Sequence, residues 1–186
     1  MIKPIKLETK LLLFGVLMAF ASCQKNNTAE DWQVYKTPYF QIEYPNEFEF
    51  VKKGQHNEKG EKMLQQASFF LYLNDSTSNE NGFQTNINLL VQDLSDSTYD
   101  LSRFCKESEK QIINLIKNSS ILESKTIKNY HRIKYKGDMD NRTLFFYQHY
   151  ELKNNQAFIL TFSSKANEAE NYLPVIDSIF NSFKLK

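Results

Sequence analysis

LFFYQHYELKNNQAFILTFS, residues 144–163, has the clearest hairpin pattern in this sequence, and the rest of the predicted fold is built around it. Leu144–Leu152 and Ala157–Ser163 are two β-rich runs, and the Asn154–Asn155 pair between them tolerates the positive φ of a tight turn. The stretch therefore predicts a β-hairpin. Both runs are apolar on both faces, so neither face of the sheet that contains them can be left to water.

Two predicted helices can cover these faces. The C-terminal segment from Tyr172 to Phe183 repeats apolar residues at helical spacing, and Pro174 fits its first turn if Asn171 caps the helix. The other helix is expected to run from Leu101 to about Lys117, with Asp100 as its cap.

Further alternating or apolar runs predict the remaining strands, which are expected at Tyr39–Tyr44, Phe48–Val51, Leu64–Leu73, Phe83–Leu94, Ile121–Lys128 and Tyr130–Lys136. Together these elements predict an α+β fold, in which a largely antiparallel sheet of six to eight strands carries a helix on each face. We expect residues 32–186 to form one domain, since the segment has the size of a single domain with its own core.

Residues 1–22 have the layout of a secretory signal peptide. Three lysines precede an apolar stretch, Leu11–Phe20, which is too short to span a bilayer of about 30 Å as a permanent helix. Ala21 and Ser22 supply the small residues of a cleavage site, and Cys23 follows them.

The segment around Cys23 resembles a bacterial lipobox, with Phe20 where leucine is usual. This resemblance implies cleavage after Ser22 and acylation of Cys23 with a diacylglycerol and an amide-linked acyl chain such as palmitate. Each buried CH₂ contributes about 0.8 kcal/mol, so two or three chains would hold the protein firmly at a membrane. The alternative is that Cys23 is incidental and a conventional signal peptidase cuts nearby.

Residues 23–31 are polar and predict a tether between the anchor and the domain. The composition and the Ser-Cys cut resemble lipoproteins of the Bacteroidetes group. In that group an acidic run after the cysteine is associated with export to the outer face, and this chain lacks such a run. We therefore expect the domain to face the periplasm from the outer membrane.

Two short loop motifs resemble O-glycosylation sites of the same group. Ser76 and Ser97 each lie in an Asp-Ser-Thr sequence within a predicted loop. The alternative is ordinary turn chemistry, since aspartate and serine are frequent turn residues.

Over residues 32–186 the chain resembles the PsbP/DcrB-like fold. The resemblance rests on the strand Tyr39–Pro45 with its Tyr-Pro end, the central helix, the aromatic hairpin and the closing Ile179–Phe183. Most proteins similar to this group are non-enzymatic, among them a photosystem accessory subunit and envelope lipoproteins. The resemblance therefore implies a binding or accessory role and supplies no catalytic motif.

The charge pattern gives no sign of nucleic-acid binding. The 23 basic and 22 acidic residues leave a net charge of +1, and lysines and glutamates are interspersed rather than clustered. Cys105 would be the only thiol left after acylation of Cys23, and it lies on the apolar side of the predicted helix. We expect it to be buried and inert.

The residues with catalytic potential are few. His56, His131 and His149 show no metal-ligand spacing, so we expect no metal and no cofactor. His149 could pair across the sheet with His131 or with a carboxylate, and the alternative is an ordinary strand histidine. The main hypothesis is a lipid-anchored, non-catalytic binding or accessory module with an envelope protein as a possible partner. The alternative is a small periplasmic enzyme with a loop-built site around His131 and His149.

Overall fold

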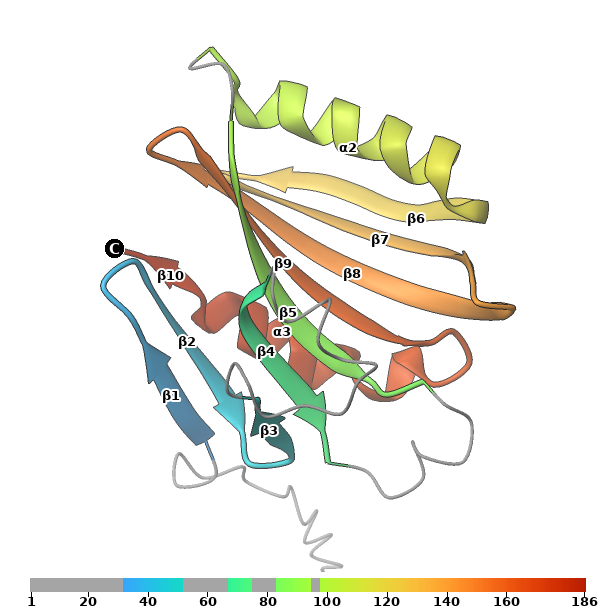
Figure 1. Ribbon diagram of the computed structural model, residues 1–186, viewed down its shortest axis with the longest axis horizontal. Coiled ribbons are helices and arrows are strands. Elements are labelled where there is room, and N and C mark those ends of the chain that lie inside the picture. The colour runs from blue at the N-terminus through green and yellow to red at the C-terminus, as the bar shows by residue number, and fades with distance from the viewer. Residues whose placement is uncertain (1–31, 52–66, 75–82, 95–97) are drawn as a thin grey trace, which may run out of the picture.

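The computed structural model describes residues 32–51, 67–74, 83–94 and 98–186 (Figure 1). Seven strands form an antiparallel sheet in the order β3-β4-β5-β9-β8-β7-β6, and a smaller sheet has the order β1-β2-β10. The strands of the larger sheet are β3 (Phe48–Phe50), β4 (Ala67–Leu73), β5 (Asn86–Asp93), β6 (Lys117–Ile127), β7 (Tyr130–Met139), β8 (Arg142–Lys153) and β9 (Gln156–Lys165). The smaller sheet contains β1 (Trp32–Lys36), β2 (Phe40–Pro45) and β10 (Lys184–Leu185).

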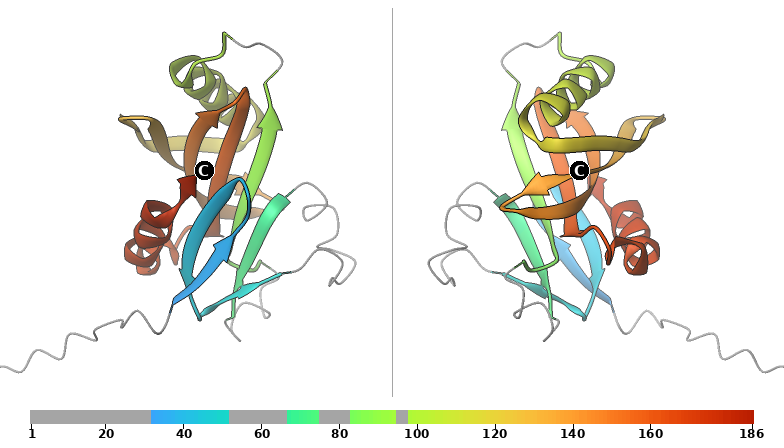
Figure 2. Two further views of the ribbon diagram at one scale, coloured as in Figure 1. Left: turned by 90° about the vertical axis from the view of Figure 1, so that its left-hand side faces the viewer. Right: turned by 90° about the vertical axis from the view of Figure 1, so that its right-hand side faces the viewer.

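Each face of the seven-stranded sheet carries a helix (Figures 1 and 2). Helix α2 (Leu101–Leu115) covers one face, where it packs over β6, β7 and β8. Helix α3 (Leu173–Ser182), which follows the short 3-10 helix η3 (Ala169–Asn171), covers the other face together with the smaller sheet. The predicted α+β architecture is confirmed.

The β8–β9 hairpin forms the middle of the sheet and contributes side chains to the core on both faces. Phe146 and Tyr150 pack with α2, whereas Phe145 and Tyr147 pack with the layer that contains α3. The predicted tight turn is confirmed, since Asn154 and Asn155 have φ values of 51° and 60°. Alternate residues of one strand therefore serve opposite layers.

Helix α2 begins where the sequence predicts. The backbone N–H of Arg103 donates to Asp100 Oδ1 over 2.7 Å, which satisfies one of the free donors of the first turn. The helix buries Phe104, Cys105 and Ile112 against the sheet. It ends at Leu115, and the chain enters β6 at Lys117.

Helix α3 buries the predicted stripe, with Ile176, Ile179 and Phe180 inside the core. Pro174 lies in the first turn, as expected, but the prediction of Asn171 as the cap is wrong. Asn171 belongs to η3, and Tyr172 precedes the helix without a side-chain capping bond.

Strands β1 and β10 were not predicted, because neither has an alternating pattern long enough to indicate a strand. Both form by antiparallel pairing with β2, in which Trp32 lies opposite Pro45 and Lys184 opposite Gln41. The end of the described chain is thereby tied to β2. None of the helices in the described ranges is long and apolar enough to cross a bilayer.

Candidate functional site

The two histidines of the sequence hypothesis lie on opposite faces of the sheet. His131 on β7 is paired with Tyr150 on β8, whereas His149 is paired with Arg132. Paired residues share a face and neighbours alternate, so His131 points toward α2 and His149 toward α3. The two rings do not form a common site, so the possible pairing of His149 with His131 does not occur. Both histidines lie on strands rather than loops, and His56 lies outside the described residues.

His131 belongs to a hydrogen-bonded cluster under α2. Ser124 Oγ donates to Glu109 Oε1 over 2.5 Å and lies 3.1 Å from His131 Nε2, while Thr126 Oγ1 lies 2.9 Å from His131 Nδ1. Because the single hydroxyl proton of Ser124 points to Glu109, His131 must donate to Ser124 through Nε2–H. A histidine that activates a serine accepts the hydrogen bond of the serine hydroxyl, so the direction of the hydrogen bond here is the opposite one.

His149 sits in a second cluster, between the sheet and α3. Arg132 Nε donates to His149 Nδ1 over 3.3 Å, and His149 Nε2 lies 2.9 Å from Glu151 Oε1. Arginine can only donate, so Nδ1 is unprotonated and Nε2–H donates to Glu151. Burial lowers the pKa of His149 and outweighs the raising effect of Glu151. His149 thus pairs with a carboxylate of its own strand rather than across the sheet, and its imidazole is neutral in this arrangement because Nδ1 accepts from Arg132.

Cys105 is buried and free, as predicted. Burial raises the pKa of its thiol to about 12, with smaller contributions from Glu109 and Asp100. A thiol in this environment is protonated at physiological pH and is a weak nucleophile. The predicted anchor residue Cys23 and the predicted glycosylation sites Ser76 and Ser97 lie outside the described residues.

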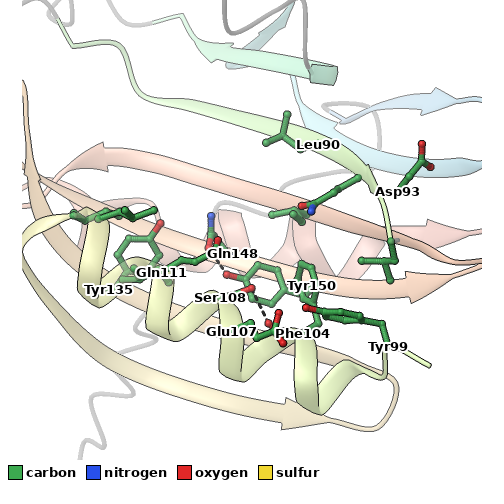
Figure 3. Close-up of a pocket in the computed structure, with 16 residues that line it drawn as sticks. Leu90, Asp93, Tyr99, Phe104, Glu107, Ser108, Gln111, Tyr135, Gln148 and Tyr150 are labelled. Carbon is green, nitrogen blue, oxygen red and sulfur yellow. Dashed lines mark hydrogen bonds between the residues drawn. The ribbon is translucent and has the colours of Figure 1, made fainter. Parts of the chain in front are cut away.

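A cleft of about 350 Å³ opens between α2 and the sheet (Figure 3). Helix α2 forms one wall and β5 the other, while residues of β7, β8 and β9 form the floor. Tyr150 and Ile159 lie on this floor, and Phe104, Ser108 and Gln111 face it from the helix. A concave site with mostly apolar walls and a few polar groups is the usual form of a ligand pocket.

The floor of the cleft supplies neutral hydrogen-bonding groups. Gln148 accepts a hydrogen bond from the Tyr150 hydroxyl and donates to Thr161 Oγ1 over 3.2 Å. Burial raises the pKa values of Tyr135 and Tyr150, so both phenols stay protonated. These groups can bind and orient a ligand, but the phenols cannot act as bases near neutral pH.

Gln148 also belongs to a polar row that crosses three strands. The register places Asn88 of β5 beside Thr161 of β9, and Thr161 beside Gln148 of β8. Asn88 and Thr161 are buried, although strands β5 and β9 are otherwise rich in apolar residues. This row was not predicted from the sequence. Polar residues at alternate positions of otherwise apolar strands were the signal available for finding it.

Within the described part of the chain, no group of three or more histidine, cysteine, aspartate or glutamate residues is placed to hold a metal ion. The strand register separates His131 and His149, and a cleft beside α2 brings together side chains from the helix and from four strands.

Comparison with known proteins shows the fold. No family model matches the chain, and no curated protein matches it in sequence. The solution structure of cyanobacterial PsbP (CyanoP) from Synechocystis is similar with a TM-score of 0.50 and 16% identity, over 90% of this chain and 99% of that protein. LpqN from Mycobacterium tuberculosis, described as involved in cell envelope biogenesis, has a TM-score of 0.56 and 6% identity, over 83% and 90% of the two chains. The chain therefore has a PsbP-like fold.

Proposed function

We propose that this protein is a lipid-anchored, non-catalytic binding or accessory module of the cell envelope, and that it holds its ligand in the cleft beside α2. The observation that carries the binding role is the cleft itself, with neutral phenol and amide groups on its floor. The anchor rests on the signal peptide and the lipobox-like sequence that ends at Cys23.

The expected localisation is the outer membrane, with the folded domain facing the periplasm. The polar residues after Cys23 and the absence of an acidic run support this orientation, and so does the resemblance to Bacteroidetes lipoproteins. LpqN, which shares the fold, is described as involved in cell envelope biogenesis. A stoichiometric envelope protein is one candidate ligand.

Metabolic labelling with palmitate tests the anchor. We expect the label and membrane retention in the native protein and their loss in Cys23→Ser. Cys105→Ala is the matched control, because it removes the other cysteine and should keep both the label and the membrane fraction. A labelled Cys23→Ser protein would contradict the proposed anchor.

Ligand capture tests the cleft. A photo-crosslinking residue at Gln111, which faces the cleft, should trap the ligand in native envelopes, and mass spectrometry would identify it. The same residue at Asn114, which is exposed on α2 and does not line the cleft, is the control. Equal products from both positions, or none from Gln111, would contradict a binding role for the cleft.

A further inference from the structure

One phenol that lines the cleft lacks a hydrogen-bond partner. Tyr99, Tyr135 and Tyr150 all line the cleft. The Tyr150 hydroxyl donates to Gln148, and the Arg103 guanidinium covers the Tyr99 ring at 4.2 Å from its centre. Tyr135 forms no hydrogen bond with any residue that the structure describes, and Figure 3 accordingly draws a dashed line at Tyr150 but none at Tyr135.

The Tyr135 side chain is buried, but its hydroxyl is open to the cleft. Only 4% of the residue is exposed, and its ring stacks on Phe146 with centroids 4.8 Å apart. In the described part of the chain, every fully enclosed side-chain nitrogen or oxygen atom has a hydrogen-bond partner. The Tyr135 oxygen has none, so it is not fully enclosed and opens onto the cleft that the residue lines. A buried tyrosine usually finds a partner for its hydroxyl, because an unpaired polar group in an apolar setting costs free energy.

The unpaired hydroxyl can act as a hydrogen-bond donor. Burial raises the pKa of Tyr135, so the phenol keeps its proton near neutral pH. Gln148 is a diagonal neighbour on the same face of the sheet, because Tyr135 lies opposite Phe146 in the register. The Gln148 amide donates one N–H to Thr161 and has a second to offer. This part of the cleft therefore presents two donors to a ligand.

The charges of the lining disfavour an anion as the acceptor. None of the described residues that line the cleft is lysine, arginine or histidine, whereas Asp93 and Glu107 do line it. A carboxylate or phosphate in the cleft would find no cation in this lining and would be repelled by the two carboxylates. A neutral acceptor avoids this repulsion.

The size of the cleft and its apolar wall describe the rest of the ligand. The volume of about 350 Å³ lies in the range of small-molecule pockets. Toward the C-terminal end of α2 the wall includes Ile112, which is buried, and Leu115, which is 79% exposed. An apolar ligand body lying against α2 would remove this exposed leucine surface from water, which is favourable.

We infer that the cleft takes a small neutral molecule with a carbonyl oxygen and an apolar body, and that Tyr135 donates a hydrogen bond to this oxygen. A ketone, an ester and an amide all supply such an acceptor. This inference rests on the binding role proposed above and adds the chemical class of the ligand.

Two probes that differ by one oxygen atom test the inference, namely 4-phenyl-2-butanone and n-butylbenzene. The full chain, held in lipid nanodiscs, would be titrated by calorimetry with empty nanodiscs as the reference. Tyr135→Phe removes the hydroxyl and keeps the ring. We expect it to weaken the binding of the ketone about two- to tenfold, the range for one neutral hydrogen bond, and to leave the binding of butylbenzene unchanged.

Infrared spectroscopy observes the hydrogen bond itself. A carbonyl group that accepts a hydrogen bond absorbs at a lower frequency than one in an apolar environment. Difference spectra against the same sample without probe should therefore show the bound ketone at a lower frequency in the native protein than in Tyr135→Phe. Tyr130→Phe is the matched control, since Tyr130 lies on the same strand but on the other face of the sheet, where it stacks on His149.

Two further measurements separate hydrogen bonding from damage to the fold and from attraction of charge. Thermal unfolding of Tyr135→Phe should show no loss of stability, because the hydroxyl that it removes has no partner among the described residues. The anion 3-phenylpropanoate should bind more weakly than the ketone.

The outcomes distinguish the inference from the proposed function. If Tyr135→Phe weakens the ketone and butylbenzene equally, or weakens neither, the inferred hydrogen bond is wrong. If 3-phenylpropanoate binds as tightly as the ketone and Gln111→Trp blocks both, the neutral class is wrong while the cleft remains a binding site. If the ketone does not bind, the inferred ligand class is wrong, and crosslinking at Gln111 then decides the binding role separately. If Gln111→Trp leaves the binding of the ketone unchanged, the probe binds elsewhere and the inference is overturned.

Discussion

Replacement of Arg132 by methionine should destabilise the protein by about 2–4 kcal/mol. The Arg132 side chain is only 12% exposed, and it donates to Asn181 over 2.8 Å, to His149 over 3.3 Å and to Asp177 over 3.5 Å. Methionine fills much of the same space but donates no hydrogen bond. The buried acceptor on His149 then loses its donor, and α3 loses two polar links to the sheet.

Lys134→Met is the matched control for this substitution. Lys134 lies two residues along β7 on the same face, and its ammonium lies 4.8 Å from the centre of the Tyr147 ring. Its ion pair with Glu123 spans 2.9 Å, but the Glu123 side chain is 51% exposed. We expect a loss of about 0.2–1 kcal/mol, the usual range for an exposed pair.

Urea unfolding followed by circular dichroism measures both losses from the midpoint and slope of each transition. An NMR titration of the imidazole signals adds a readout that general damage would not produce. Arg132 contributes to the lowered pKa of His149, so Arg132→Met should raise that pKa, whereas Lys134→Met should leave it unchanged. Equal losses of stability in the two variants, or a His149 pKa that does not rise in Arg132→Met, would contradict this account of Arg132.

Three further predictions concern other parts of the fold. Acidification from about pH 8 to about pH 5 should lower the free energy of unfolding. Burial lowers the His149 pKa below its ordinary value of 6.5, so the unfolded chain takes up the proton first as the pH falls. Calorimetry should show a weaker pH dependence of stability in His149→Gln. Gly137→Ala should cost about 1–3 kcal/mol, since the added Cβ would lie 2.3 Å from Ile116 Cγ2, and a double-mutant cycle with Ile116→Ala should show coupling. Asn154→Ala should cost about 1–2 kcal/mol because Asn154 has a φ of 51°, whereas Asn154→Gly should be nearly neutral by urea unfolding.

Local patterns predicted the elements whose stability is decided nearby in the chain. The Asp100 cap needs only its own helix, and the turn at Asn154 and Asn155 needs only its own hairpin. The apolar stripe that contains Ile176 and Phe180 requires burial, whatever element covers it. These features could be read from sequence because a few adjacent residues determine them.

Elements that depend on distant partners could not be predicted in the same way. Strand β10 has two residues and exists because β2, more than 130 positions earlier, offers an edge for pairing. Asn171 has the side chain of a good cap, yet the chain forms η3 there and begins α3 beyond it. A capping preference is local to the residue, and here the conformation of the segment between β9 and α3 places Asn171 inside η3 instead of at the start of α3.

The histidines illustrate the same limit for sites. His131 and His149 are both on strands of one antiparallel pair, and a shift of one residue in register would place them on the same face. The observed register separates them and gives each ring its own cluster. The sequence identified histidine as the candidate for acid–base chemistry, but only the strand register shows that the two rings cannot act together.

The cleft lies on the face of the sheet that carries the polar row of Asn88, Thr161 and Gln148. The α3 face is packed with apolar side chains such as Leu160 and Phe162, and it also carries the hydrogen-bonded cluster around His149. The α2 face instead carries the row Asn88, Thr161 and Gln148, although burying amides and hydroxyls costs free energy unless each is hydrogen-bonded. Gln148 donates to Thr161 and Asn88 donates to Asn86, so hydrogen bonds offset part of this cost. The row reaches the cleft through Gln148, so the binding role proposed above would use amide and hydroxyl groups that the sheet already holds in place.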